Sequence, residues 1–178
     1  RFRALEPYMQ NATPHGAKRT PADFVDGLQG WDFIETVRGA WKGALIVKGI
    51  MHPEDAIKAI QLGADAIVVS NHGARQFDGA PASIEVLPAI AAAVNGRAKV
   101  LFDSGIRGGL DIIRALSLGA DFCLLGRAFL FAVAALGDRG GNHASDILRA
   151  DLVNNMIQLG AHTLQDLRSF QCRTISGA

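Results

Sequence analysis

Four segments of the sequence carry side chains that could bind anions and move protons. Each follows a run rich in Val, Ile, Leu and Phe, and together they supply one lysine, one histidine, one aspartate and three arginines. The candidates are Lys48; Ser70, His72 and Arg75; Asp103, Ser104, Gly105 and Arg107; and Gly126 and Arg127. In parallel α/β proteins, ligands bind in the loops beyond the carboxyl ends of the strands. We therefore expect these side chains to converge on one rim.

The last two segments have the composition of a phosphate site. Glycines let backbone N–H groups approach a phosphate, and Arg107 and Arg127 add positive charge and fork-shaped donors. Paired loops after the last two strands are a recurrent phosphate position in barrel enzymes. The alternative is that these glycines only form tight turns while the arginines cover apolar surface. We favour the phosphate site because both loops carry glycine beside arginine.

His72 and Arg75 lie three residues apart in a segment that also contains glycine. A histidine titrates near neutral pH and suits general base catalysis, while an arginine can hold a carboxylate through two parallel hydrogen bonds. Taken alone, the pair would favour a solvated loop with a helix-capping histidine. Lys48 alone is equally ambiguous, because a lysine at a strand end often lies at the surface. Four other histidines have no spacing typical of metal ligands or of a base beside a nucleophile, so we interpret them as structural: His15, His52, His143 and His162.

Apolar runs without helical spacing predict four strands buried on both faces. They cover residues 44–47, 66–69, 99–102 and 122–125. Between them, apolar residues recur at helical spacing. One helix is predicted to start at Pro53, with Glu54 and Asp55 in its first turn, and to stop at Gly63; another covers residues 110–118.

Further apolar stripes extend the pattern in both directions. Trp31, Ile34, Val37 and Trp41 have the spacing of one helix upstream of the first strand. Leu148, Leu152, Met156 and Leu159 predict a helix that ends at Gly160, with Thr163 as a candidate N-cap for a last short helix.

An internal repeat supports this alternation of strands and helices. Residues 60–65 (IQLGAD) resemble residues 116–121 (LSLGAD), at an offset of 56 residues, or two strand–helix units. Buried strands that alternate with helices imply parallel pairing through right-handed crossovers. Four such units could form a small open sheet or half of an eight-stranded barrel, which usually takes about 250 residues.

The composition narrows the classes of function. The chain has 178 residues, and 18 Lys+Arg against 17 Asp+Glu leave a net charge of +1, which does not favour a nucleic-acid partner. Two cysteines cannot build a disulfide framework, and Cys123 in its apolar run is predicted to pack in the core, in keeping with a reducing compartment. No apolar run approaches the ~20 residues of a membrane-spanning helix, and residues 1–20 do not resemble a signal peptide. Motifs typical of nicotinamide, nucleoside triphosphate, zinc-protease and α/β-hydrolase sites do not occur in the sequence.

The four segments closely resemble the FMN-dependent 2-hydroxy acid dehydrogenase/oxidase family. The densest matches are LIVKGI at residues 45–50, SNHGARQFDG at 70–79, DSGIRGGLDI at 103–112 and LGADFCLLGRAFL at 118–130. Within the family, the sequence DSGIR is most similar to that of the cytochrome- or quinone-linked L-lactate dehydrogenases. The resemblance implies an α/β fold in which residues 1–178 form the C-terminal half of a (β/α)8 TIM barrel, with residues 1–30 as an irregular loop leading into it.

The resemblance also implies FMN as the cofactor and an L-2-hydroxy acid, most closely L-lactate, as the substrate. It makes His72 the catalytic base and Arg75 the ligand of the substrate carboxylate. Lys48 would lie near N1 and the C2 carbonyl of the flavin, and Ser70 would bond to the ring system. The remaining cofactor-binding residues would surround the ribityl chain and phosphate: Asp103, Ser104, Gly105, Arg107, Gly126 and Arg127.

Several partners are implied in the same way. They are a quinone, a cytochrome or oxygen as electron acceptor, the N-terminal half of the barrel, and further copies in a homo-oligomer. The expected location is cytoplasmic, with peripheral attachment to the inner face of the cytoplasmic membrane as an option. The alternatives are a non-catalytic half-barrel that binds a phosphate ligand or acts as a scaffold, and another FMN- or phosphate-binding barrel enzyme, against which His72 with Arg75 argues.

Two positions depart from the family pattern. Family members usually have a second glycine where this chain has Ala74, and leucine where it has Phe77. A Cβ at position 74 costs free energy if the backbone there needs a positive φ. We therefore expect the conformation of residue 74 to decide whether this departure matters.

Overall fold

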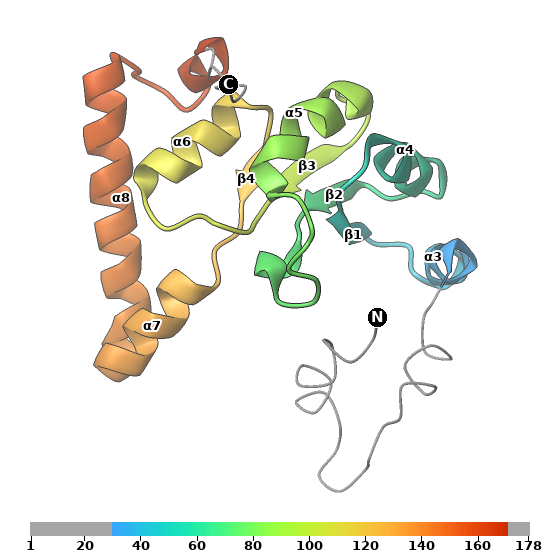
Figure 1. The fold of residues 1–178 in the computed structure, drawn as a ribbon, viewed down its shortest axis with the longest axis horizontal. Helices are drawn as coiled ribbons and strands as arrows, with labels where there is room; N and C mark the ends of the chain where they lie inside the picture. The colour runs from blue at the N-terminus through green and yellow to red at the C-terminus, as the bar shows by residue number, and fades with distance from the viewer. Residues whose placement is uncertain (1–29, 171–178) are drawn as a thin grey trace, which may run out of the picture.

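The computed structural model describes residues 30–170 and has one parallel sheet at its centre (Figure 1). The strands are β1 (Ile46–Ile50), β2 (Ala66–Val69), β3 (Lys99–Phe102) and β4 (Phe122–Cys123). They lie in the order β1-β2-β3-β4, and every neighbouring pair is parallel. This sequential parallel order is the arrangement of strands in half of a (β/α)8 barrel, as predicted.

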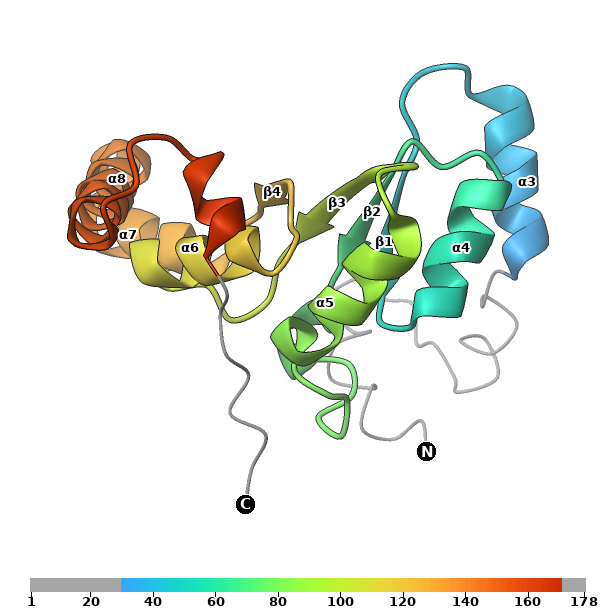
Figure 2. The same ribbon diagram turned by 90° about the horizontal axis from the view of Figure 1, so that it is seen from above.

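Helices connect the strands and continue beyond β4. They are α3 (Trp31–Ala40) before β1, then α4 (Pro53–Gln61), α5 (Ser83–Val94), α6 (Gly109–Ser117), α7 (Arg127–Leu136) and α8 (Gly140–Leu159). Short 3-10 helices are η2 (His72–Ala74), η3 (Gly137–Arg139) and η4 (Asp166–Ser169). Figure 2 shows α3, α4, α5 and α6 following one another along one side of the sheet.

The helix boundaries follow the signals in the sequence. Pro53 opens α4, and Nδ1 of His52 accepts a hydrogen bond from the Glu54 N–H at 3.3 Å. Gly63, at φ 89°, follows the end of α4, and Gly160, at φ 69°, ends α8. His52 is thus a capping residue, in agreement with its structural interpretation.

The core lies between the sheet and the helices. Alternate strand residues point to the same face, and two of those directed at the helices, Ile67 and Phe102, are at most 2% exposed. They pack with Leu87 of α5 in one cluster. On the opposite face, the described residues of the two edge strands are exposed, with Ile46 at 49% and Phe122 at 60%, whereas Val68 of the inner strand β2 is 2% exposed. Apolar residues exposed at both edge strands are what half of a closed barrel presents.

Two strand boundaries differ from the prediction. The first strand was expected at residues 44–47, but β1 runs to Ile50 and contains Lys48. Its pairing with β2 shifts between Lys48 and Ile50, because Gly49 at φ 96° inserts a bulge that lets pairing continue. The fourth strand was expected at residues 122–125 but pairs only over two residues, although the Leu124 N–H still donates to the Phe102 carbonyl at 2.8 Å.

The repeated Gly-Ala-Asp sequence marks the amino ends of β2 and β4. Asp65 accepts the Leu45 N–H at 2.8 Å, and Asp121 accepts the Val100 N–H at 2.9 Å. Each carboxylate also binds an arginine from outside the sheet, Arg38 at 3.1 Å and Arg168 at 2.8 Å. The aspartates of the two repeat copies therefore have the same role. Each links the start of its strand to the neighbouring chain segment and to an outer helix, α3 for Asp65 and η4 for Asp121.

The structure also bears on the predictions for Cys123, Thr163 and Trp41 and for membrane-spanning helices. Cys123 is half-buried against the core, and burial raises the pKa of its thiol to about 12. Thr163 accepts the Asp166 N–H at 3.3 Å just before η4, and Trp41 lies immediately beyond α3. Within residues 30–170 no helix combines the length and the apolar character needed to cross a bilayer. The irregular loop expected at residues 1–30 lies, apart from residue 30, outside the described residues, as does His15.

Candidate functional site

A cavity of about 250 Å³ opens at the carboxyl ends of the strands. Nine of the ten predicted site residues line it, and only Ser70 does not. Ser70 is 1% exposed and contacts Lys48 directly. The cavity wall also includes residues that the sequence did not single out: Gly73, Ile106, Leu124 and Leu125. The structure therefore brings the predicted residues together at one rim, and their individual roles stay predictions.

Three polar side chains from neighbouring strands form the floor of the site. Lys48 Nζ lies 2.8 Å from Asp103 Oδ2 and donates to Ser70 Oγ at 2.7 Å. Burial alone would raise the pKa of Asp103, but Lys48 and the hydroxyls of Ser70 and Ser104 outweigh it and hold that pKa below its ordinary value. Asp103 is therefore a carboxylate at neutral pH and keeps a fixed partner for the Lys48 ammonium.

The loop after β2 holds His72 in an unusual backbone conformation. His72, Gly73 and Ala74 have φ of 57°, 66° and 60°, so three consecutive residues lie in the left-handed region. The loop is anchored below, where the Asn71 N–H donates to the buried Ser83 hydroxyl at 2.9 Å. Non-glycine residues adopt this region only when their surroundings impose it, and such residues cluster at functional sites.

The imidazole of His72 lies against Gly49 of β1. A Cβ at Gly49 would come within 3.2 Å of His72 Cε1, so the bulge glycine leaves room for the ring. Burial and the nearby Lys48 charge lower the pKa of His72 below its ordinary value, while Asp103 acts in the opposite direction. The imidazole is consequently neutral near pH 7 and able to accept a proton. Arg75, three residues along, lines the same cavity.

The two predicted anion loops differ in the amides that they leave open. At the start of α6, the N–H groups of Arg107 and Gly108 donate to Asp111 at 3.0 and 3.2 Å, and the Gly109 N–H donates to the Asp151 carboxylate of α8. The start of α7, after Gly126, has no side-chain cap among the described residues. Of the two loops, the one before α7 is therefore the better anion site.

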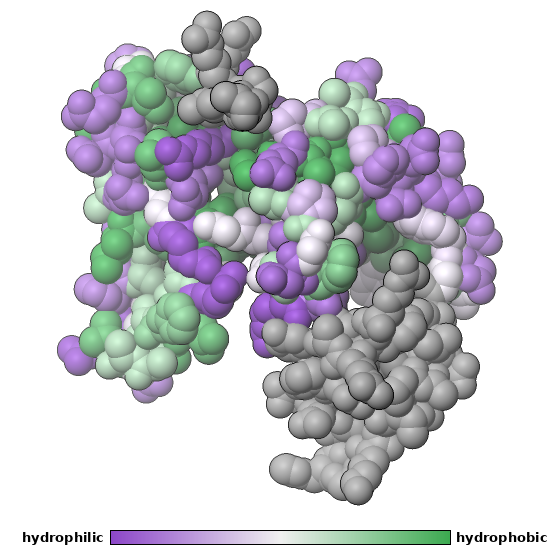
Figure 3. Space-filling view, in the orientation of Figure 1, coloured by the Kyte–Doolittle hydropathy of each residue, from purple (hydrophilic) through white to green (hydrophobic). Residues whose placement is uncertain are grey.

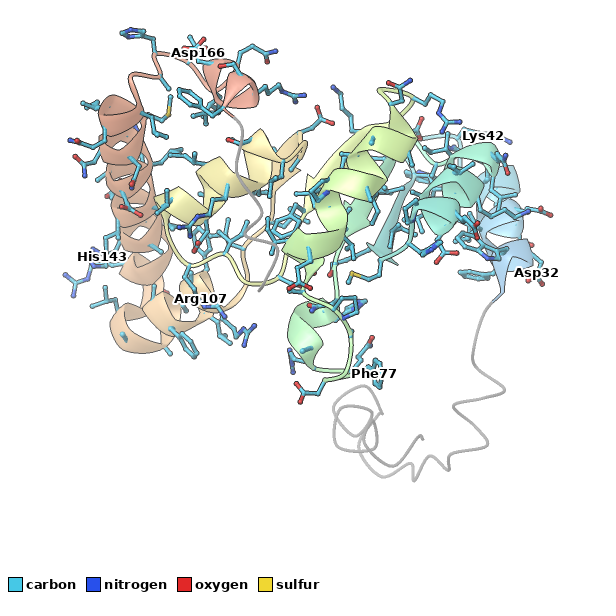
Figure 4. The ribbon with its side chains drawn as sticks, turned by 45° about the horizontal axis from the view of Figure 1, so that its top comes forward. Asp32, Lys42, Phe77, Arg107, His143 and Asp166 are labelled. Carbon is cyan, nitrogen blue, oxygen red and sulfur yellow. The ribbon has the colours of Figure 1, made fainter. Side chains whose placement is uncertain are left out.

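Two arginines of the cavity wall, Arg107 and Arg127, lie beside this candidate anion site. The Arg127 guanidinium reaches toward the His72 loop, where its Nη2 lies 2.8 Å from the place that a Cβ on Gly73 would take. Figure 4 shows Arg107 on the loop that leads into α6, close to α7. Figure 3 shows a hydrophilic patch around this hollow and apolar residues over α7. Within residues 30–170 no group of three or more His, Cys, Asp or Glu side chains could hold a metal ion.

The departures from the family pattern both fall in the His72 loop. Ala74 has φ 60°, so the condition under which its Cβ costs free energy is met. Phe77 is 68% exposed and projects from the tip of the loop in Figure 4.

The sequence matches the protein family described as FMN-dependent dehydrogenase over residues 3–174. It is 49% identical over 137 residues to an L-lactate dehydrogenase of Xanthomonas axonopodis pv. citri, which aligns 77% of this chain with 35% of that protein. An L-lactate dehydrogenase of Acinetobacter baumannii is 48% identical over 139 residues, with 78% of this chain and 36% of the relative covered. The chain thus spans about a third of the length of these relatives.

Solved structures of mandelate oxidase share the fold. One, determined with (S)-4-hydroxymandelic acid, aligns with a TM-score of 0.76 and 41% identity, covering 79% of this chain and 39% of the oxidase. Another, with 3,3-difluoro-2-hydroxy-3-phenylpropionic acid, gives a TM-score of 0.78 and covers 92% of this chain and 49% of the oxidase. With the family match over most of the sequence, these likenesses establish that the chain belongs to the FMN-dependent dehydrogenase family.

Proposed function

We propose that this chain supplies the C-terminal half of an FMN-binding barrel that oxidises an L-2-hydroxy acid, most closely L-lactate, to the 2-oxo acid. The observation that carries the proposal is the convergence of Lys48, His72, Arg75 and Arg127 on one cavity in a member of this family. The names of its relatives, L-lactate dehydrogenase and mandelate oxidase, support the substrate class.

The charge of the cavity fits FMN. Four cationic side chains line it against the single carboxylate of Asp103: Lys48, Arg75, Arg107 and Arg127. The excess positive charge matches a phosphate dianion, for which the start of α7 and Arg127 are the best ligands. Gly105, at φ 95°, and Gly126 allow close approach of a ligand to the backbone. When bound, FMN supplies an acceptor for two electrons and the α-hydrogen of the substrate.

The side chains of this chain account for the rest of the chemistry. Arg75 binds the substrate carboxylate, and the neutral His72 accepts the hydroxyl proton. Loss of that proton, and of the α-hydrogen nucleus together with two electrons, converts the alcohol carbon to a carbonyl. Lys48, fixed by Asp103 and Ser70, would place a positive charge beside the bound cofactor and would stabilise negative charge there.

Completion of the barrel is part of the proposal. A further four strands would cover the face of the sheet on which Ile46 and Phe122 are exposed, and would pair with β1 and β4. α7, which carries only one polar side chain and buries no residue, is a second surface for them to cover. The electron acceptor, the homo-oligomeric state and the cytoplasmic or membrane-peripheral location stay predictions.

Replacement of His72 tests the proposal. In FMN-loaded protein, His72→Ala should slow anaerobic bleaching of the flavin by L-lactate by about 10²- to 10⁴-fold, the usual contribution of a general base. The flavin absorbance before substrate addition should not change. His143→Ala, at an exposed position of α8, is the matched control and should bleach normally.

Two results would contradict the proposal. Undiminished bleaching in His72→Ala would exclude His72 as the base. Retention of FMN without reduction by any L-2-hydroxy acid in the unsubstituted protein would instead favour the non-catalytic, phosphate-binding alternative.

A further inference from the structure

Three consecutive backbone amides in the His72 loop are each held by a different side-chain oxygen. The His72 N–H donates to Ser70 Oγ at 3.1 Å, the Gly73 N–H to Ser104 Oγ at 3.0 Å, and the Ala74 N–H to Asn71 Oδ1 at 3.2 Å. These bonds coincide with the three left-handed residues. The loop is therefore held by side chains at the point where its backbone is least favourable.

Ser104 differs from the other two acceptors in its place in the fold. Ser70 and Asn71 are neighbours of the loop in sequence, whereas Ser104 follows β3 and lies 31 residues from Gly73. Its bond is the one among the three that ties the loop to another strand. Removal of Ser70 or Asn71 would alter the loop from within, but removal of the Ser104 hydroxyl would detach it from β3.

The hydroxyl of Ser104 is used in both directions. It accepts the Gly73 N–H and donates its proton to Asp103 Oδ1 at 2.8 Å. A serine hydroxyl has one proton, so this donation leaves none for another acceptor. Asp103 binds Lys48 through its other oxygen. A continuous chain of polar contacts thus links Lys48, Asp103 and Ser104 to the backbone beside His72.

Ser104 also has a strained backbone. Its φ is 79°, in the region that serine rarely adopts, and the next residue, Gly105, has φ 95°. This conformation aligns the hydroxyl with both Asp103 and the His72 loop. The hydrogen bond thus joins two segments of positive φ, Ser104 on one side and Gly73 between the non-glycine residues His72 and Ala74 on the other, which is a sign that this link is specified by the fold.

We propose that Ser104 is a positioning residue for His72 and that its hydroxyl donates no hydrogen bond to the cofactor. This inference rests on the proposed function, in which His72 is the general base. It revises the cofactor-binding role that the sequence resemblance implies for Ser104. Through the Gly73 amide, Ser104 fixes the imidazole relative to the Lys48–Asp103 pair on the cavity floor.

The experiment compares Ser104→Ala with Ser117→Ala. Ser117 Oγ is buried in α6 and has no hydrogen-bond partner among the described residues, so its removal controls for loss of a buried hydroxyl. In FMN-loaded protein, we expect Ser104→Ala to lower kcat about 10-fold, with the KM for L-lactate and the Kd for FMN each within about twofold of the unsubstituted values. Ser117→Ala should change none of them.

A second variant separates the hydroxyl from the backbone strain. Ser104→Gly removes the hydroxyl and also relieves the positive φ. It should show the same loss of kcat as Ser104→Ala. Normal kcat in Ser104→Gly would mean that the strained backbone, not the hydroxyl, is what matters, and would overturn the proposal. A weaker affinity for FMN with unchanged kcat in Ser104→Ala would overturn it as well, because that result identifies a cofactor ligand.

Measurements without FMN keep this test apart from that of the proposed function. In the cofactor-free protein, Ser104→Ala should speed hydrogen exchange at the Gly73 amide and move the NMR titration of His72 upward, as the imidazole gains contact with water. The charged side chains that line the cavity with His72 are Lys48, Asp103, Arg75, Arg107 and Arg127. Neither serine variant removes any of these charges, and Ser104→Ala takes one hydrogen bond from Asp103, which keeps its ion pair with Lys48. If both measurements match those of Ser117→Ala, the proposal fails whether or not the protein oxidises L-lactate.

Discussion

The carboxyl-end loops of the sheet and the links at its amino ends meet the same demand for positive φ with different residues. At the amino ends, the turns into β2 and β4 use Gly63 and Gly119, at φ 89° and 108°. At the carboxyl ends, the comparable conformations fall on His72, Ala74 and Ser104 as well as on glycines. The turn into β3 uses Asn95, at φ 47°, and asparagine tolerates this region better than most residues. The amino ends thus use residues that suit a positive φ, whereas the carboxyl ends place it on residues whose side chains are needed there.

Carboxylates at the two ends also serve different purposes. Asp121 and Asp65 each accept a strand N–H and bind an arginine, so their contacts hold the outer elements on the sheet. Asp103 binds Lys48 and lines the cavity. In barrel folds the carboxyl ends carry function and the amino ends carry stability. Substitutions at the two ends should therefore separate activity from stability.

Among the substitutions that compare the two ends of the sheet, the largest effect is expected from Lys48→Met at the carboxyl end. Loss of the positive charge beside the cofactor should slow reduction of bound FMN by about 10²-fold, the usual cost of removing one electrostatic group from a preorganised site. Lys99→Met is the matched control at the amino end, where Lys99 Nζ lies 3.4 Å from Asp121 and the side chain is 74% exposed. It should leave the reduction rate unchanged.

The pH dependence of Lys48→Met tests whether Lys48 lowers the pKa of His72. A neutral His72 is the active form, so kcat/KM should rise with pH through the pKa of His72, which burial and then Lys48 hold below the ordinary value of about 6.5. In Lys48→Met the inflection should move to higher pH, because one cause of the lowered pKa is gone. A downward shift, or an equal shift in Lys99→Met, would contradict the electrostatic link between Lys48 and His72.

At the amino end, Asp121→Ala should lower the free energy of unfolding by about 1–3 kcal/mol, since the Val100 N–H and Arg168 lose their acceptor in a partly buried place. Urea denaturation followed by circular dichroism measures this change. Asp65→Ala removes the equivalent contacts at a more exposed carboxylate, with 57% of its side chain accessible against 22% for Asp121, and should cost less.

Neither aspartate variant should alter the rate of flavin reduction under conditions where the protein is folded. A loss of activity without a loss of stability in Asp121→Ala would break the division between the two ends.

The order of the helices and strands was predictable because residues at their ends determine where each one begins and stops. Gly63 and Gly160 have positive φ, which few other residues adopt, and Pro53 is preset for the first turn of a helix. Apolar runs bounded by such signals identify buried strands. The position of Lys48 inside β1 was not predictable, since a bulge at Gly49 depends on pairing with β2. Pairing partners come from the tertiary structure and leave no local mark in the sequence.

The membership of the site was predictable for a related reason. Parallel strands bring their carboxyl ends to one rim, so the position of a polar residue after an apolar run was enough to place nine of ten candidates. The hydrogen bonds among them were not predictable, because Ser104 meets Gly73 across 31 residues and Asp151 caps α6 across 42. Such contacts depend on distances that only the folded chain fixes.

The smallest effect, Ala74→Gly, tests the strain at the carboxyl end directly. Glycine at φ 60° removes the steric cost of the Cβ but increases the entropy of the unfolded chain, and the difference should raise the free energy of unfolding by about 0.5–1 kcal/mol. Ala134→Gly in the exposed middle of α7 is the control, and it should lower that free energy by about 1 kcal/mol because glycine is a poor helix former. Opposite signs for the same substitution in one denaturation series would locate the strain in the His72 loop. A loss of stability in both variants would mean that Ala74 is unstrained, and the contrast with the glycine turns at the amino ends would then rest on His72 and Ser104 alone.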